Sequence, residues 1–212
     1  MLEVRQDSKP VRRRKRSVTT EDQTILRQTI IDVARGLLAT GGFRAATMKA
    51  IARQADIATG TVYLYFPSKA DLFAEVFRVV SGREVRAVAA AAEGARPAIK
   101  ALEAAIRTFV DRAIRGRRMA YALIAEPVDP AIEVERLMSR RAFAQVFADV
   151  IRSGMATGEL SSQNPDIVAA ALIGAINEAL VRPLSPASEA LEEHREEIMN
   201  EIISFCLAAV VR

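Results

Sequence analysis

Apolar residues recur at helical spacing from about residue 20 to the end of the chain, and no alternating strand pattern persists in any segment. Glycine and proline interrupt this pattern at several points, which divides it into separate helices. The sequence therefore predicts an all-α fold of about nine helices. Their expected ranges are 20–40, 47–55, 59–66, 68–93, 98–116, 117–125, 131–156, 165–181 and 188–211.

Residues that cap helix ends support several of these boundaries. Thr20 and Gln23 have the spacing of a capping box, in which each side chain satisfies a free backbone amide, and Ser68 and Asp71 repeat it at the fourth helix. Gly41-Gly42 accepts the positive φ that often follows a helix end. We expect the first helix to end near residue 39 or 40. Its buried stripe is predicted to be Leu26, Ile30, Val33 and Leu37.

The helices of the second half of the chain carry strongly apolar faces. The stripe predicted to point inward from residues 131–156 is Leu137, Phe143, Phe147 and Ile151. Residues 165–181 contain several small side chains, which allow another helix to approach closely. The last two helices can complete the core of one chain, or each can pair with its copy across a two-fold axis.

Charge is distributed unevenly along the chain. The net charge is +4, but residues 1–69 hold 13 Lys or Arg against 6 Asp or Glu, whereas the remainder holds 17 against 20. We therefore expect a polyanion partner at the amino-terminal end. Residues 12–16 are five consecutive cations within residues 1–18, which lack apolar periodicity, so this basic arm is expected to be disordered.

The chain contains few of the residues that enzymatic or metal sites require. Cys206 and His194 are its single cysteine and histidine, which excludes an intrachain disulfide and a cluster of metal ligands. With no glycine-rich phosphate loop either, we expect neither an enzyme nor a cofactor. No apolar run approaches the roughly 18 residues that span a bilayer, and residues 1–20 lack a signal peptide's apolar centre. These features predict a cytoplasmic protein without a membrane partner.

Residues 47–69 are predicted to form a short helix, a turn and a second short helix. The segment reads TMKAIARQADIATGTVYLYFPSK, and Ile51, Ile57, Val62 and Phe66 are placed to pack its two helices together. This arrangement is typical of a helix-turn-helix, whose second helix lies in the major groove of DNA. The pattern leaves six residues on the outward side of that second helix: Thr59, Gly60, Thr61, Tyr63, Leu64 and Tyr65.

The segment IARQADIATGTVYLYFPSKADLF resembles the signature of the TetR family of bacterial transcriptional regulators. The resemblance is strong from about residue 20 to residue 77, where it includes Gly41-Gly42-Phe43, and beyond that only the helical architecture fits. Two residues depart from the family pattern: Asp56 replaces a glycine in the turn, and Ala58 replaces a common capping serine. Asp tolerates the left-handed conformation, so we expect the turn to form, with a less well capped recognition helix.

The resemblance implies a homodimer, usually a repressor, that binds a palindromic operator in double-stranded DNA. It implies phosphate contacts for Thr47, Tyr63 and Lys69, with a further backbone contact from Arg44. Residues near the bases are implied to be Thr59, Gly60 and Thr61, and Leu64 and Tyr65 occupy the positions that read sequence. The basic arm can enter the minor groove or remain a solvated tail that adds salt-dependent affinity.

The resemblance also implies that a small-molecule effector enters a cavity bounded by the fifth to eighth helices, and that the last two helices form the dimer interface. Apolar candidates for the cavity lining are Phe109, Met119, Tyr121, Leu123, Phe143, Phe147, Ile173 and Ile176, with Asn177 and Glu178 as polar anchors. Core packing is the alternative for each of these residues, and the sequence favours it. An apolar lining favours an apolar or amphipathic effector of unknown identity.

Four regions are expected: the arm (1–18), a helix-turn-helix domain (19–67), a connecting helix (68–93) and an effector-binding and dimerisation domain (94–212). A transcriptional activator of the same fold is an alternative to the repressor. A helical protein that binds small molecules without reading an operator is a second alternative, which the outward Thr61, Tyr63 and Lys69 disfavour.

Overall fold

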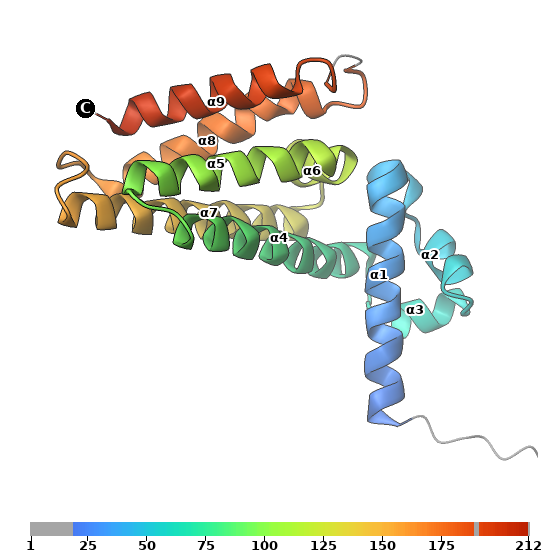
Figure 1. Ribbon diagram of the computed structural model, residues 1–212. Helices are drawn as coiled ribbons and strands as arrows, with labels where there is room; N and C mark the ends of the chain where they lie inside the picture. The colour runs from blue at the N-terminus through green and yellow to red at the C-terminus, as the bar shows by residue number, and fades with distance from the viewer. Residues whose placement is uncertain (1–18, 189–190, 212) are drawn as a thin grey trace, which may run out of the picture.

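The computed structural model describes residues 19–188 and 191–211. Within these ranges the chain forms nine helices and no strand, which confirms the all-α prediction (Figure 1). The helices are α1 (Thr20–Ala45), α2 (Met48–Gln54), α3 (Thr59–Tyr65), α4 (Lys69–Glu93), α5 (Ala98–Arg115), α6 (Arg117–Ile124), α7 (Pro130–Ala156), α8 (Pro165–Leu184) and α9 (Arg195–Val210). The basic arm and its minor-groove contact lie outside the described residues.

The molecule has two parts that meet at α4. Figure 1 shows α1 standing across the end of an elongated bundle of α4–α9, with α2 and α3 on the side of α1 away from the bundle. The first core joins α1, α2, α3 and the first half of α4 and also includes Ala122 of α6 and Ile132 of α7, whereas the second fills the bundle from Val88 to Val210. Both cores consist of fully buried aliphatic and aromatic side chains, whose burial is the main stabilising contribution to such a fold.

The start of α1 is capped one residue earlier than expected. The Thr19 hydroxyl accepts a hydrogen bond from the Asp22 amide at 3.1 Å, and the Asp22 carboxylate accepts one from the Thr19 amide at 3.0 Å. The predicted Thr20–Gln23 box is therefore wrong, because Thr19 with Asp22 has the same spacing and takes its place. Ile30 of the predicted stripe is fully buried, whereas Leu26, Val33 and Leu37 are half-buried beside Ile31, Ala34 and Leu38.

Helix α1 continues past the predicted end, through a kink at Gly42. The Gly42 backbone has φ 66° and ψ −171°, a conformation that is essentially restricted to glycine. Gly42 thus interrupts the helix as the sequence predicts, but one further turn follows it to Ala45. A side chain at Gly42 would also overlap the guanidinium of Arg118 from α6.

Three predictions about the later helices are wrong. Leu137 was expected inside, but it is 46% exposed on α7, beside the exposed Val134 and Met138. Helix α8 passes through Pro183 and ends at Leu184, which is fully buried. Helix α9 begins at Arg195 rather than near residue 188.

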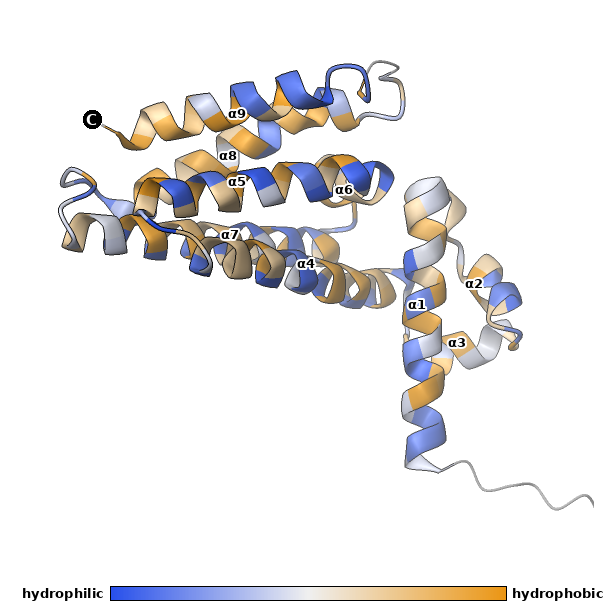
Figure 2. Cartoon of the chain, in the orientation of Figure 1, coloured by the Kyte–Doolittle hydropathy of each residue, from blue (hydrophilic) through white to orange (hydrophobic). Residues whose placement is uncertain are grey.

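Helix α8 also corrects the expectation that no segment is long and apolar enough to cross a bilayer. Its 20 residues meet that test by length and composition, as the hydrophobic colour along it in Figure 2 indicates. Ala169, Leu172, Ile173 and Ile176 of α8 belong to the core of the bundle, and the helix packs on α6, α7 and α9. Only 39% of the most apolar stretch of α8 is buried within the chain. We interpret α8 as a core helix with one uncovered face.

Candidate DNA-binding face and effector cavity

Helices α2 and α3 have the geometry of a helix-turn-helix. The Thr47 hydroxyl caps α2 by accepting a hydrogen bond from the Ala50 amide at 3.1 Å. In the turn, Asp56 has φ 54°, the left-handed conformation expected of it, and Ala58 provides no side-chain cap for α3. Val62 is fully buried beneath α3, so the opposite side of this helix faces solvent.

The outward side of α3 presents the residues that were expected to meet DNA. Leu64 is 84% exposed and Tyr63 is 48% exposed, so two adjacent large side chains face solvent on this side of the helix. Gly60 is exposed and has open space where a side chain would stand, whereas Thr59, Thr61 and Tyr65 are half-buried. Thr47 and Arg44 are exposed at the start of α2 and at the end of α1.

Two exposed cations of α2, Lys49 and Arg53, were not among the predicted contacts. The signal that could have found them is their charge within the first helix of the motif, since that helix crosses the phosphate backbone in known complexes.

Lys69 has a structural partner in addition to its expected phosphate. Its ammonium donates a hydrogen bond to the Phe43 carbonyl at 2.6 Å and lies 5.5 Å from the centre of the Phe73 ring. Burial lowers the pKa of Lys69, an effect that the nearby Glu126 carboxylate opposes. Lys69 therefore ties the start of α4 to the end of α1, and its contact with DNA stays a prediction.

The same end of α1 is held by α6 and the loop after it. Arg118 of α6 pairs with Glu126, whose carboxylate also accepts a hydrogen bond from the Phe43 amide at 3.4 Å. The buried Arg136 of α7 donates hydrogen bonds to the carbonyls of Leu123 at 2.8 Å and Glu126 at 2.7 Å. The conformation of the loop after α6 is thereby linked to the position of α1.

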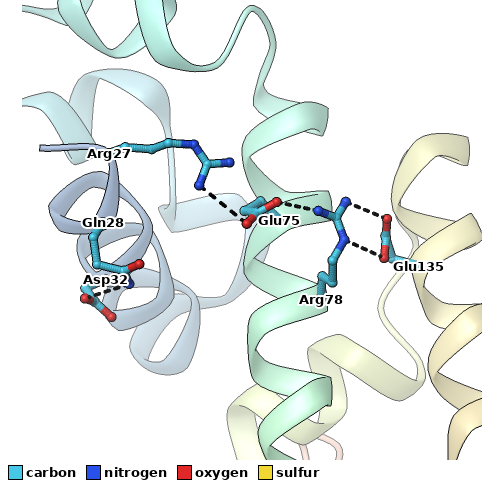
Figure 3. Close-up of polar contacts among 6 residues, drawn as sticks. All are labelled: Arg27, Gln28, Asp32, Glu75, Arg78 and Glu135. Carbon is cyan, nitrogen blue, oxygen red and sulfur yellow. Dashed lines mark hydrogen bonds and ion pairs between the residues drawn. The ribbon is translucent and has the colours of Figure 1, made fainter. Parts of the chain in front are cut away.

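A second polar connection runs from α1 through α4 to α7 (Figure 3). Arg27 of α1 lies 3.5 Å from Glu75 of α4, and Glu75 accepts a hydrogen bond from Arg78 at 2.6 Å. Arg78 also donates to both carboxylate oxygens of Glu135 of α7, at 2.9 Å and 3.4 Å, and this pairing raises the pKa of Arg78. The Arg27 guanidinium lies 5.0 Å from the centre of the Phe66 ring, directly after α3.

A cavity of about 110 Å³ lies between α4, α5, α6 and α7, next to these connections. Four of the predicted lining residues contribute to it: Phe109, Met119, Leu123 and Phe143. Sequence reasoning missed the α4 residues Val80, Ser81, Glu84 and Val88, together with Arg112, Ala113, Gly116, Ala120, Ile124 and Ser139. A periodic pattern shows that a helix has an inner face, but it does not show where two such faces fail to fill the space between them.

Six other predicted residues lie away from this cavity. Phe147, Ile173 and Ile176 are fully or almost fully buried in the core of the bundle, and Tyr121 packs half-buried against it. Asn177 is buried on α8, whereas Glu178 is exposed and so is no anchor for a ligand in this cavity. Core packing accounts for these positions other than Glu178, as the sequence allowed.

No cluster of metal-binding side chains occurs among residues 19–188 and 191–211. Cys206 is buried, and burial raises the pKa of its thiol to about 11. His194 pairs with Glu197 on the surface at 2.9 Å.

A helix-turn-helix with an outward recognition helix, joined to a helical bundle with an internal cavity, defines a DNA-binding regulator rather than an enzyme. Comparison with known families agrees. The amino-terminal model of bacterial regulatory proteins of the tetR family matches residues 30–76, and a tetracyclin repressor-like C-terminal domain matches residues 95–180. The chain belongs to the TetR family of transcriptional regulators.

Individual relatives match this chain over different lengths. The transcriptional repressor KstR of Mycobacterium tuberculosis is 37% identical over 79 residues, which are 37% of this chain and 36% of KstR. The FadR regulator of Bacillus subtilis, solved with stearoyl-CoA, has a TM-score of 0.70 at 17% identity and covers 86% of this chain and 98% of its own. RolR, solved with resorcinol, has a TM-score of 0.70 at 19% identity and covers 92% of each chain. These two structures share the fold.

Proposed function

We propose that this protein is a transcriptional repressor that binds a palindromic operator as a homodimer and leaves it when a small apolar or amphipathic effector binds. The observation that carries the proposal is the outward face of α3, where Leu64 and Tyr63 are exposed on a helix whose other side is buried. Only a small part of KstR aligns with this chain, so its repressor activity supports the proposal as an analogy.

In this proposal α3 lies in the major groove. Leu64 and Tyr65 contact base edges, and the hydroxyl groups of Thr47 and Tyr63 bind phosphates. Thr59, Gly60 and Thr61 lie near the bases at the start of the recognition helix. Arg44 and Lys69 add positive charge at the backbone. Such contacts separate into those that read sequence and those that only position the protein.

The experiment that tests DNA reading is selection of bound oligonucleotides from random DNA, carried out with wild type, Leu64→Ala and Tyr63→Phe. Wild type should recover one palindrome, and Leu64→Ala should change the preferred base at symmetric positions by about 1 to 3 kcal/mol. Tyr63→Phe should weaken binding to all sequences alike. Val134→Ala, at an exposed apolar residue of α7, is the matched control and should change nothing. Recovery of no motif by wild type would leave the alternative of a helical protein that binds small molecules only.

The dimer is proposed to form through α8 and α9. Ile167 of α8 is 67% exposed and Phe205 of α9 is 63% exposed, and Gly174 in the middle of α8 has nothing near the position of a side chain. Glycine inside a helix costs about 1 kcal/mol relative to alanine. No contact within the described chain offsets this cost, whereas a second helix that packs closely on α8 would use the free space.

The cavity between α4, α5, α6 and α7 is the proposed effector site. It touches α6, which is linked to α1 through Glu126, and α7, which is linked to α1 through Glu135 and Arg78. An effector that fits better when these helices move apart therefore favours a dimer state in which the two DNA-binding domains are separated differently. Activation instead of repression depends on where the operator lies, and a promoter fusion with and without the regulator gene distinguishes the two.

A further inference from the structure

The charged side chains at the proposed effector cavity neutralise one another. Among the described residues that line it, Glu84 of α4 and Arg112 of α5 are the charged ones, and the rest are apolar except for two serines and a glycine. The Arg112 side chain donates two hydrogen bonds to the Glu84 carboxylate, one of them from Nη2 at 3.0 Å and the other from Nε. The pair closes one side of the cavity and is partly open to solvent, with 44% of Arg112 and 30% of Glu84 exposed.

This pairing determines which polar groups the cavity accepts. A ligand carboxylate near the pair is attracted by Arg112 and repelled by Glu84 to a similar extent, so its loss of hydration is not compensated. A ligand ammonium has the opposite interactions and the same net result. A hydroxyl or carbonyl group loses less hydration and can hydrogen-bond the carboxylate oxygens or the remaining guanidinium N–H groups.

We infer that the effector of this protein is an uncharged molecule, with an apolar body and a hydroxyl or carbonyl group that hydrogen-bonds the Glu84–Arg112 pair. The inference rests on the proposed function, because it assumes that the effector occupies this cavity. It distinguishes the chain from a regulator that senses free carboxylic acids, which requires an unpaired cation at the site.

Three probes of equal chain length test the inference: hexan-1-ol, hexanoate and hexylammonium. The full-length protein, with ¹³C-methyl-labelled methionine, is titrated with each probe at neutral pH. Met119 lines the cavity, and its methyl signal is assigned by its loss in Met119→Leu. Met155, near the end of α7 and outside the lining, provides a reference signal.

We expect hexan-1-ol to shift the Met119 signal with a dissociation constant at least tenfold below those of both charged probes. Glu84→Gln removes the carboxylate that Arg112 hydrogen-bonds, so the dissociation constant of hexanoate should fall to or below that of hexan-1-ol. Arg112→Gln should do the same for hexylammonium. Arg107→Gln is the matched control, because Arg107 pairs with Glu103 at 3.8 Å on the same helix but does not line the cavity.

Two results would overturn the inference while leaving the cavity as the effector site. One is tighter binding of hexanoate than of hexan-1-ol by wild type, and the other is an unchanged order of probes in Glu84→Gln and Arg112→Gln. A Met119 signal that no probe moves would overturn it by removing the cavity as its site. Operator selection, which needs no ligand, tests the DNA-binding part of the proposed function independently.

Discussion

Gly42 is a point of close approach between the bundle and helices α1–α3, which we call the reading head. Its φ of 66° with ψ of −171° is available to glycine, and the Arg118 guanidinium lies where a side chain would begin. Backbone conformation and packing therefore require glycine independently. Gly60 on α3 is different, because it is helical and has open space around it.

We expect Gly42→Ala to lower the free energy of unfolding by about 1 to 3 kcal/mol, since alanine strains the backbone and displaces Arg118. Gly60→Ala is the matched control and should be neutral or stabilising by up to about 1 kcal/mol, because alanine favours the helix. Urea unfolding followed by circular dichroism measures both changes. Equal stability of wild type and Gly42→Ala would contradict the argument.

Cys206 gives the chain a specific dependence on alkaline pH. Burial raises the pKa of its thiol from the ordinary 9.0 to about 11. Between these values the unfolded chain has lost a proton that the folded chain retains, so the unfolding free energy decreases as pH rises. The stabilisation is fully present below pH 9.0 and is lost by about pH 11, a change on the order of 2 kcal/mol.

The measurement is urea unfolding of wild type and Cys206→Ala at a series of pH values across this window. The variant loses packing at every pH, so its unfolding free energy should be lower throughout. The difference between the two proteins should narrow as pH rises, because only wild type has the thiol. A constant difference would show that the thiol ionises alike in both states.

At the scale of elements, helical periodicity was sufficient to predict which segments are helices, but not every boundary or neighbour. The Ser68–Asp71 capping box forms as predicted, whereas Thr19 replaced Thr20 because two adjacent threonines have suitable partners three residues on. Leu137 has the spacing of an inward residue of α7, but its side chain remains 46% exposed. The outward face of α3 could be predicted because one short motif determines it, while the cavity depends on how four helices fit together.

The uncovered faces of α8 and α9 lead to a prediction about assembly. Ile167→Glu and Phe205→Glu place a charge on the proposed interface, and we expect each to raise the dimer dissociation constant at least tenfold, since an unpaired buried charge is costly. Met138→Glu also replaces an exposed apolar residue, but on α7, and should leave the dimer unchanged. Sedimentation equilibrium measures the constants.

Each variant should retain the circular dichroism spectrum of wild type, because these side chains are exposed in the single chain. If Met138→Glu alone dissociates the dimer, the interface lies on the exposed residues of α7 instead. Loss of the dimer in all three variants would indicate general destabilisation instead of a defined interface.

For the whole molecule, the central question is how the bundle fixes the position of the reading head. Three polar connections reach α1: Lys69 and Glu126 at its carboxyl end, and the series Arg27, Glu75, Arg78 and Glu135 nearer its middle (Figure 3). Partly exposed ion pairs contribute only about 0 to 1 kcal/mol each to stability. Their geometric role is larger, since they join α1 to α4 and α7, two helices that line the cavity or pack against it.

The Arg78–Glu135 pair therefore affects operator binding more than folding. We expect Arg78→Gln and Glu135→Gln each to change the unfolding free energy by less than about 1 kcal/mol. Each should weaken operator binding by about 0.5 to 2 kcal/mol, because a less restrained head must be ordered when it binds. The double variant should bind no more weakly than Arg78→Gln alone, because that change already breaks the pair with Glu135 as well as the pair with Glu75. Arg152→Gln breaks pairs with Asp149 and Asp166 at the far end of α7 and serves as the control. If it weakens operator binding equally, the loss of a positive charge is responsible, and not a less restrained head.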